Sequence, residues 1–580
     1  MSSPRIRRVS GSAALATAST PAELLSMLYA QRGLADGEEA APGLGSLHPA
    51  GALRGIEEAV DLLAGQIRSG GHLLVVSDYD ADGATGGALA VRGLRSLGAA
   101  RVSYLIPSRF AFGYGLSPGV VEAAAASRPD LVMTVDNGIS SVSGVARARE
   151  LGIPVLVTDH HLPGERLPAA AAIVNPNQPD CPFPSKHLAG VGVVFYLLVA
   201  VRTRLRERGW FSARRPEPNL ADLLDLVALG TVADVVTLDR NNRILVEQGL
   251  RRIRAGRCGA GVRALLTVAG RDPSRVTAAD LAFFAAPRLN AAGRIQDMSV
   301  GVECLLTEDP LAASELARAL DDLNRRRREI EGQMRGQAET LVAGLSLDGS
   351  SLPPGLCLFG EDWHQGVSGI VAARIRERYH RPVIAFAHGG EGLLRGSARS
   401  IEGLHIRDLI ALVDRRCPGL VERFGGHAMA AGLSIRTEAL NRFEDAFAEA
   451  VLEQLGDQPP QPEICSEGAL PARLMTLETA EALRVAGPWG KGFPEPRFDG
   501  TFEVLGARLV GDGHLKLRVS DQAAGAGPID AIGFNMGEHL SEAGGKLRLA
   551  YRLDVNDYRG KRSPQLLIEH LEQTRGTAHL

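Results

Sequence analysis

The chain has 580 residues, 45% of them hydrophobic, and a formal net charge of -3 at pH 7. This length predicts about three or four domains with conventional cores. The nearly balanced charge excludes a general polyanion binder and an acidic tail, so any contact with a polyanion must depend on local patches.

The six cysteines lie far apart and form no CxxC pair, which argues against a zinc ribbon and against a disulfide framework. Residues 1–20 carry Arg5, Arg7 and Arg8 but no apolar stretch long enough for a signal peptide. No charge-free apolar run reaches the roughly 18 residues of a membrane span. We therefore expect reduced thiols, no membrane segment and a cytoplasmic location.

The first part of the chain predicts a doubly wound α/β domain with a parallel sheet, because short apolar runs alternate with helical patterns. The expected strands are His72–Val76, Val102–Ile106, Leu131–Val135 and Pro154–Val157, and the expected helices are Gly86–Leu97, Pro118–Ala126 and Ser140–Glu150. The last strand leads into a loop that carries Asn175-Pro176.

Beyond Gly190 the pattern becomes helical, most clearly at Val191–Leu205, Asn219–Leu229 and Asn242–Arg254. From about Leu311 to Ala343, apolar residues recur at spacings of three, four or seven, which predicts one long helix that spans two domains. Its Arg325–Arg328 run either contacts phosphates or forms a solvated face, and the solvated face is the better interpretation.

A second mixed α/β region and a small barrel complete the chain. The expected elements of this region are strand Leu356–Phe359, helix Gly369–Tyr379, strands Pro382–Phe386 and Leu393–Ala398, helix Ile406–Val413 and strand Ala430–Ile435. After a proline-rich linker at 458–462, apolar residues alternate in Leu515–Val519 and Leu547–Leu553, which predicts short strands of a barrel. Four of the five lysines lie past residue 490, which fits a barrel surface that faces phosphates.

Three clusters of acidic or histidine residues each follow a predicted strand of the first domain. They are Asp78, Asp80 and Asp82; Asp136 in Asp136-Asn137-Gly138; and Asp159, His160 and His161. Because the carboxyl ends of parallel strands meet at one edge of a sheet, we expect these side chains in one crevice. Helix or turn capping explains any one aspartate, but together they would repel one another without a cation. The pattern therefore predicts a metal site.

The ligand chemistry favours Mn²⁺ or Mg²⁺ over zinc, since carboxylates outnumber imidazoles. Asp234, at the end of Gly230-Thr231-Val232-Ala233-Asp234, offers a further carboxylate, so there are ligands for two ions. Two such ions, about 3.5 to 4 Å apart, clamp a phosphoryl centre and generate a hydroxide. A phosphoryl substrate is therefore expected.

The order of these motifs resembles the DHH phosphoesterase superfamily, and further motifs resemble its RecJ family of single-strand-specific DNA exonucleases. The further motifs lie at 107–109, 113–117, 175–177, 287–294, 363–367, 396–400 and 425–427. The resemblance covers nearly the whole chain and implies five segments. They are an N-terminal extension (1–50), a DHH catalytic domain with a helical part (51–310), a connecting helix (311–345), a DHH-associated domain (346–457) and an OB-like nucleic-acid-binding barrel (463–575).

The resemblance also implies roles for individual residues at the metal site. Metal ligands are expected at Asp80, Asp82, Asp136, His160 and Asp234, and the resemblance leaves the place of Asp78 open. His161 is expected to face the scissile phosphate, and Asp159 is expected to orient the neighbouring imidazoles.

Further residues are expected to hold the DNA. Ser397, Arg399, Arg109 and Arg288 are candidates for a terminal 5′-phosphate, and a Gly425-Gly426 turn with His427 would bring backbone amides close to it. The other expected contacts are Tyr114, Asn290 and His364. A salt bridge explains Arg109 or Arg288 equally well, and a turn explains His364. Tyr114, Tyr551 and Tyr558 are candidate stacking platforms, although core packing explains Tyr551 at least as well.

The resemblance implies a 5′ to 3′ exonuclease that releases 5′-mononucleotides from single-stranded DNA in repair and recombination. The expected partners are a strand with a 5′ end, a helicase and a single-strand-binding protein, and a monomer is expected. One alternative is a DHH hydrolase of short oligonucleotides, cyclic dinucleotides or pyrophosphate, whose members typically lack a C-terminal barrel. The other is a catalytically inactive DNA-binding scaffold, against which the complete set of acids and histidines argues.

Overall fold

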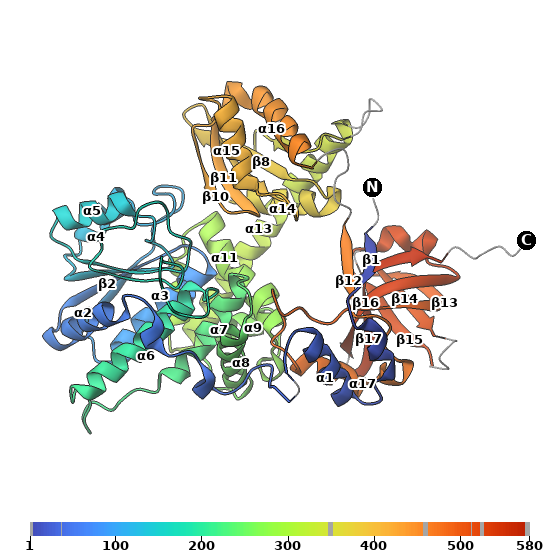
Figure 1. The fold of residues 1–580 in the computed structure, drawn as a ribbon, viewed down its shortest axis with the longest axis horizontal. Helices are drawn as coiled ribbons and strands as arrows, with labels where there is room; N and C mark the ends of the chain where they lie inside the picture. Colours follow the sequence, from blue (N-terminus) through green and yellow to red (C-terminus); the bar gives the residue numbers. More distant parts are fainter. Residues whose placement is uncertain are drawn as a thin grey trace, which may run out of the picture. The chain divides into compact units, whose positions relative to one another are not determined.

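The computed structural model describes residues 4–35, 37–345, 352–455, 462–511, 513–521, 527–558 and 560–574. The chain forms two compact units (Figure 1). Unit 1 consists of Met1–Arg7 and Leu323–Ile464, and unit 2 consists of Arg8–Asp322 and Cys465–Leu580. Within the described residues, no helix combines the length and apolar character that a bilayer-spanning segment needs.

Unit 2 contains a five-stranded parallel sheet in the order β3-β2-β4-β5-β6. Its strands are β2 (His72–Ser77), β3 (Arg101–Leu105), β4 (Leu131–Val135), β5 (Val155–Thr158) and β6 (Ala172–Val174). The first four confirm the predicted strands within one residue at each end. β6 lies in the segment expected to be a loop. The sequence did not predict this strand, because its three residues are too few to show a periodicity.

Helices cover both faces of this sheet, which confirms the doubly wound α/β class. Figure 1 shows α4 (Pro118–Ala125) and α5 (Val142–Glu150) on one side of β2, and α2 (Ile56–Ser69), α3 (Ala81–Ser96) and α6 (Gly190–Glu207) on the other. Val120, Val121 and Val145 pack with Leu74 and Val132 of the strands in one buried cluster.

Helix α3 begins five residues earlier than its predicted start at Gly86. Asp80 caps it, since its Oδ1 accepts a hydrogen bond from Gly83 N at 2.9 Å. Gly83 is needed for close packing at this end of the helix, because a Cβ there would overlap the backbone of Asp78. Asp82 consequently lies in the first helical turn rather than in a loop.

A helical part follows the sheet. It contains α7 (Leu224–Ala233), α8 (Arg240–Arg254), α9 (Ala260–Val268), α10 (Ala278–Asp280), a π-helical turn η6 (Leu281–Ala285), α11 (Ala286–Ile295) and α12 (Ser299–Leu306). The predicted long helix is confirmed as α13 (Pro310–Leu345), a single helix of 36 residues that carries the chain from unit 2 into unit 1.

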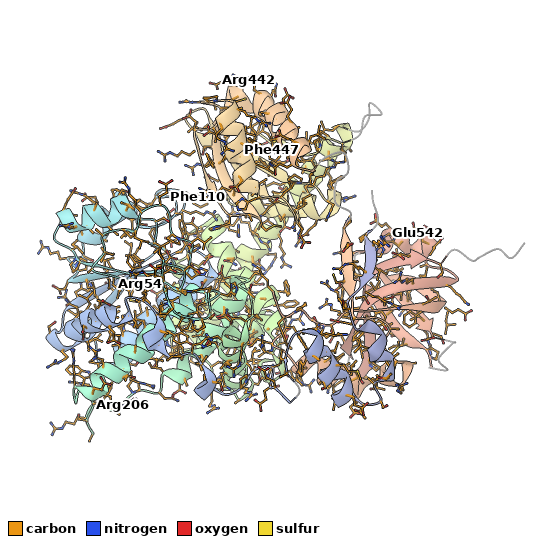
Figure 2. The ribbon with its side chains drawn as sticks, in the orientation of Figure 1. Arg54, Phe110, Arg206, Arg442, Phe447 and Glu542 are labelled. Atoms are coloured by element: carbon orange, nitrogen blue, oxygen red, sulfur yellow. The ribbon has the colours of Figure 1, made fainter. Side chains whose placement is uncertain are left out.

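Unit 1 contains a second five-stranded sheet in the order β10-β11-β9-β8-β7, in which β7 and β8 are parallel and the other pairs are antiparallel. The strands are β7 (Leu356–Phe359), β8 (Val383–Gly390), β9 (Leu393–Arg399), β10 (Arg423–Gly426) and β11 (Ala430–Arg436), and the helices are α14 (Ser368–Tyr379), α15 (Ile406–Arg416) and α16 (Leu440–Leu455). Phe447 of α16, labelled in Figure 2, lies fully buried in the core of this unit.

The expected Gly425-Gly426 turn is wrong, because both glycines lie on strand β10, opposite Gly432 and Ala431 of β11. The turn comes after them, and His427 N donates to Ala430 O at 2.8 Å across it. Gly426 has a φ of 140°, and a Cβ there would collide with Ala431. Gly426 thus permits a close strand pairing rather than a reversal of the chain, whereas a Cβ at Gly425 would meet nothing within 4 Å.

The predicted C-terminal barrel is confirmed as a closed barrel in the order β13-β14-β15-β17-β16. Its strands are β13 (Phe498–Val510), β14 (His514–Ser520), β15 (Ile529–Gly533), β16 (Lys546–Tyr558) and β17 (Lys561–Gln573), and α17 (Leu477–Val485) precedes them. Three of these strands have 13 residues, so the expectation of uniformly short strands is wrong. Irregularities in register at Val504/Gly506 and Ala550/Tyr551 let the long strands bend around the barrel.

The N-terminal residues belong with the barrel core. Leu24 and Leu28 of α1 (Pro21–Gln31) lie in one buried cluster with Phe498 and Leu549 of the barrel. Strand β1 (Arg5–Arg8) also pairs with β12 (Glu463–Ser466), which precedes the barrel. Residues 458–461 of the predicted linker lie outside the described residues.

Candidate active site

The three clusters predicted from the sequence meet at the carboxyl ends of β2, β4 and β5. Among the described residues, the ligand atoms of three groups each lie within 4.8 Å of one another. The groups are Asp136, His160 and His161; Asp82, His160 and Asp234; and Asp78, Asp80 and Asp136. Asp234 comes from outside the sheet, at the C-terminal end of α7. The expected cluster is therefore present, and it contains every predicted metal ligand.

The imidazole of His160 lies among three of these carboxylates. Its Nε2 is 3.1 Å from Asp136 Oδ1, 3.5 Å from Asp234 Oδ2 and 3.8 Å from Asp82 Oδ2. Asp136 occupies the left-handed backbone region at a φ of 62°, which costs free energy for a residue with a side chain. Such strain is typical of functional sites, and here it turns the carboxylate of Asp136 toward His160.

Helix α6 holds Asp82 from the opposite side. Gly190 N donates to Asp82 Oδ2 at 2.6 Å and Val191 N donates to Asp82 Oδ1 at 2.9 Å. These N–H groups belong to the start of a helix, which favours a negative charge. A Cβ at Gly190 would lie 2.7 Å from Asp136 Cβ, so only glycine lets α6 approach both carboxylates.

The buried carboxylates disfavour one another's charge. Burial, with the neighbouring carboxylates, raises the pKa of Asp78, Asp136 and Asp234 well above the usual range and that of Asp82 to about 7. Within the described residues, the buried Asp136 Oδ1 accepts no hydrogen bond. A cation would neutralise this cluster, and carboxylate oxygens with an imidazole nitrogen suit Mn²⁺ or Mg²⁺. The residues therefore fit the predicted metals.

Asp159 lies in none of these three groups and holds the two histidines. Its Oδ1 accepts from His160 N at 2.7 Å and lies 2.7 Å from His161 Nδ1, and its Oδ2 accepts from Ile139 N at 2.9 Å. Burial opposes the charge on His161, but the hydrogen bond and attraction from Asp159 outweigh it and raise the pKa of His161 to about 9. His161 is thus oriented and charged by Asp159.

Tyr114 makes a contact that the sequence did not reveal. Its hydroxyl donates to Asp136 O at 3.1 Å and lies 3.0 Å from His161 Nδ1. The ring is half exposed, so one edge remains available to a ligand. The sequence analysis expects Tyr114 to contact the substrate, but no signal in the sequence links it to His161.

The other substrate contacts expected in unit 2 are occupied by intramolecular partners. Arg288 is buried, pairs with Asp321 at 2.7 Å and donates to Phe284 O, so the salt-bridge interpretation applies to it. Asn290 Oδ1 accepts from Ala81 N at 2.9 Å and thereby supports the start of α3. The guanidinium of Arg109 lies 4.9 Å from the ring centre of Tyr79.

The expected contacts in unit 1 gather on one stretch of its sheet. Ser397 pairs with Gly432, which in turn pairs with Gly425, and Arg399 pairs with Ala430 on the same ladder. Arg399 is packed so closely against α14 that a Cβ at Gly369 would lie 2.8 Å from its Nη2, and burial lowers the pKa of the guanidinium.

His364 takes part in a turn, as the alternative interpretation holds. Its Nδ1 accepts a hydrogen bond from Gly366 N at 3.1 Å. Of the barrel tyrosines, Tyr551 is fully buried in the core and Tyr558 is exposed. Tyr551 is therefore wrong as a stacking platform, whereas Tyr558 and Tyr114 keep an accessible face.

Comparison with known proteins covers each part of the chain. Residues 72–231 match the DHH family N-terminal domain, residues 352–453 match the DHHA1 domain and residues 466–570 match the RecJ OB domain. The single-stranded-DNA-specific exonuclease RecJ of Escherichia coli is 53% identical over 96% of this chain and 97% of its own length. The protein of that name from Dickeya dadantii is 55% identical over 94% of this chain and 96% of its own length.

A solved structure agrees with these relatives. The crystal structure of RecJ in complex with Mn²⁺ from Thermus thermophilus matches with a TM-score of 0.79 at 30% identity, covering 99% of this chain and 80% of that chain. The fold and the acidic and histidine site thus define a DHH-type phosphoesterase with an added oligonucleotide-binding barrel. Within this class, the chain belongs to the RecJ family of single-stranded-DNA-specific exonucleases.

Proposed function

We propose that this chain hydrolyses the phosphodiester bonds of single-stranded DNA from the 5′ end and releases 5′-mononucleotides. The observation that carries the proposal is the cluster of Asp78, Asp82, Asp136 and Asp234 around His160, buried at one sheet edge of a chain with a RecJ-type barrel. A purely structural role does not account for three buried carboxylates and a fourth, partly buried one whose charges disfavour one another.

Two divalent cations, Mn²⁺ or Mg²⁺, are proposed to occupy this cluster, with Asp80, Asp82, Asp136, His160 and Asp234 as ligands and Asp78 beside Asp80 and Asp136. Bound there, such ions supply a hydroxide at neutral pH and neutralise charge that develops on the phosphate. The backbone N–H groups of Gly190 and Val191 would keep Asp82 in place throughout.

His161 is proposed to act on the scissile phosphate. Its hydrogen bond to Asp159 raises its pKa, which favours the protonated ring, and the same bond fixes the plane of the ring. A charged imidazole makes a strong hydrogen bond to a phosphate oxygen. Tyr114, which contacts His161 and keeps an exposed face, is placed to meet the nucleotide beside that phosphate.

Recognition of the strand end is assigned to unit 1. Ser397, Arg399, Gly425, Gly426 and His427 are proposed to bind the terminal 5′-phosphate, with Arg109, Arg288, Asn290 and His364 contributing contacts or supporting loops. The partly buried guanidinium of Arg399 donates to the Ala398 carbonyl and pairs with no carboxylate of the described residues, so a phosphate would supply the negative charge that its surroundings lack.

The wider setting is proposed from the same family. The barrel would hold the downstream strand, and the enzyme would act as a monomer in repair and recombination with a helicase and a single-strand-binding protein. The domains would follow the five predicted segments, except that residues 8–35 accompany the barrel whose core they complete.

The test uses single strands labelled at either end, with a 5′-phosphate or a 5′-hydroxyl, in Mn²⁺ and in Mg²⁺. We expect mononucleotides from the 5′ end first and faster cleavage of the phosphorylated strand. Release from the 3′ end first would refute the polarity. Faster turnover of a dinucleotide than of a long strand would favour the alternative of a small-substrate hydrolase.

A further inference from the structure

Unit 2 contains a cavity of about 770 Å³ beside the proposed catalytic residue Asp234. Val232 and Val235, which flank Asp234 in the chain, both line it. The facing wall is formed by the loop 487–495 that connects α17 to the barrel, and by residues of β16 and β17. The cavity thus extends from the catalytic edge toward the barrel within one compact unit.

The lining combines aromatic faces with cations, which is the chemistry that binds single-stranded nucleic acid. Phe283 is 74% exposed and Phe534 is 56% exposed, so both rings offer an uncovered face. Several of the arginines are already neutralised by carboxylates. Arg497 and Arg552, for example, both pair with Glu569 at 2.7 Å.

Lys491 differs from these arginines. It is exposed, and within the described residues its ammonium group has no hydrogen bond or ion pair. Its positive charge acts on Asp234, where it opposes the increase in the pKa of that carboxyl that burial and neighbouring acids cause. Lys491 thus lines the cavity, has no partner for its ammonium group among the described residues and interacts electrostatically with Asp234. It is therefore available to bind a phosphate.

The backbone of the 487–495 loop fixes where Lys491 stands. Leu238 N donates to Lys491 O at 2.7 Å, four residues after Asp234. Gly490 and Gly492 allow this contact, because a Cβ at either position would overlap Leu238 or Thr237. The connection is purely through the backbone, so a change of the lysine side chain leaves it in place.

The ring of Phe493 anchors the same loop. It stacks on Trp489 with ring centroids 5.1 Å apart, and the guanidinium of Arg243 lies 4.3 Å from its centre. Arg243 belongs to α8, the helix that follows Asp234 and Leu238 in the chain. The loop and the catalytic edge are therefore held in one arrangement, which sets the position of Lys491.

We propose that Lys491 is a substrate-positioning residue whose ammonium group binds a backbone phosphate of the single strand, on the 3′ side of the bond that is cleaved. This rests on the proposed function, because it assumes a strand that enters by its 5′ end. The strand leaves the catalytic edge past Val235, meets Lys491 and continues through the cavity toward the barrel.

The experiment compares a 5′-phosphorylated strand of about 30 nucleotides with a 5′-phosphorylated dinucleotide, which has no phosphate beyond the cleaved bond. The full-length protein and the variants Lys491→Ala and Lys491→Arg are assayed in Mn²⁺ at several salt concentrations. Arg68→Ala is the matched control, since it removes one exposed positive charge from α2, outside both the cavity lining and the barrel.

We expect Lys491→Ala to raise KM for the long strand about fivefold, the scale of one exposed ion pair, with little change in kcat. The slope of log binding constant against log salt concentration should become shallower by about 0.7, which is the value for one phosphate contact with a single strand. Lys491→Arg should restore both quantities, and Arg68→Ala should change neither.

Equal losses on both substrates, an unchanged KM and salt slope, or no rescue by arginine would overturn the role of Lys491. A wild-type protein that releases nothing from the 5′ end of either substrate would instead refute the proposed function. The two failures are therefore distinguishable in a single set of assays.

Discussion

Asp136 at the end of β4 and Asp499 on β13 are both buried carboxylates of unit 2, but their surroundings differ. Asp499 accepts hydrogen bonds from Ser466 Oγ at 2.6 Å and from Arg8 and Arg548 at 2.9 Å. Asp136 faces other carboxylates and the imidazole of His160. The barrel thus supplies cations of its own for its buried acid, whereas the catalytic edge does not.

The pKa values express the same difference. Burial alone would raise the pKa of Asp499, but the bonds from Arg8, Ser466 and Arg548 outweigh it and lower the value. At Asp136, burial and the repulsion from Asp82, Asp80 and Asp78 act together and raise it. Removing one partner from a completed ion-pair network leaves charge uncompensated and costs stability, whereas a cluster of like charges without such partners is a candidate site for an external cation.

The strongest test of this comparison is Asp136→Asn, which keeps the shape of the side chain and removes its charge. We expect cleavage of single-stranded DNA to fall by about a thousandfold or more, because an electrostatic group at the reacting centre is lost. The variant should still bind a labelled strand. The free energy of unfolding of the metal-free protein should not fall, because the substitution removes a charge that the neighbouring carboxylates repel.

Asp499→Asn is the control for that variant, because it removes a buried charge far from the catalytic chemistry. It should retain its turnover number while losing stability. Cleavage by Asp136→Asn within tenfold of wild type would contradict the assignment of Asp136 to the metal centre.

Metal removal is the second test. A chelator should abolish cleavage, and Mn²⁺ returned at about a hundred times its dissociation constant should stabilise the folded protein by about 2.7 kcal/mol for each site that it fills. Thermal unfolding followed by calorimetry measures this gain. The gain should be absent or much reduced in Asp136→Asn, and an equal gain in both proteins would place the cation elsewhere.

The catalytic edge could be predicted from the sequence because its geometry follows from topology. Parallel strands place their carboxyl ends on one edge, so Asp78, Asp136 and His160 had to meet once β2, β4 and β5 were recognised. Asp234 required the family's motif, since nothing local in α7 indicates that its C-terminal end reaches the sheet.

Features that depend on long-range packing could not be predicted in this way. Leu24 and Leu28 indicate a helix by their spacing, but their partners in the barrel lie more than 400 residues away in the chain. Gly425 and Gly426 have the composition of a turn, and only their pairing with β11 makes them strand residues. A glycine in a sequence indicates that space or backbone freedom is needed at that position, but it does not indicate which contact or conformation needs it.

The third test concerns the stability of the barrel. Asp499→Asn should lower the free energy of unfolding by about 2 kcal/mol, because charge-assisted hydrogen bonds to two arginines and a serine are weakened. Urea denaturation, followed by a probe in the barrel, measures the loss. A variant as stable as wild type would show that the network around Asp499 contributes no net stability.

The smallest expected effect is the pH dependence of that difference. A carboxyl whose folded pKa is lowered contributes stability that is present above its unfolded pKa, about 3.9, and is lost as the pH falls through the folded value. The gap between wild type and Asp499→Asn should therefore be constant from about pH 6 to pH 5 and shrink progressively below about pH 4. Comparing the two proteins at each pH cancels the other acids of the chain. A gap that widens in acid would mean that Asp499 binds its proton more tightly when folded, as Asp136 does, and the contrast between the two sites would fail.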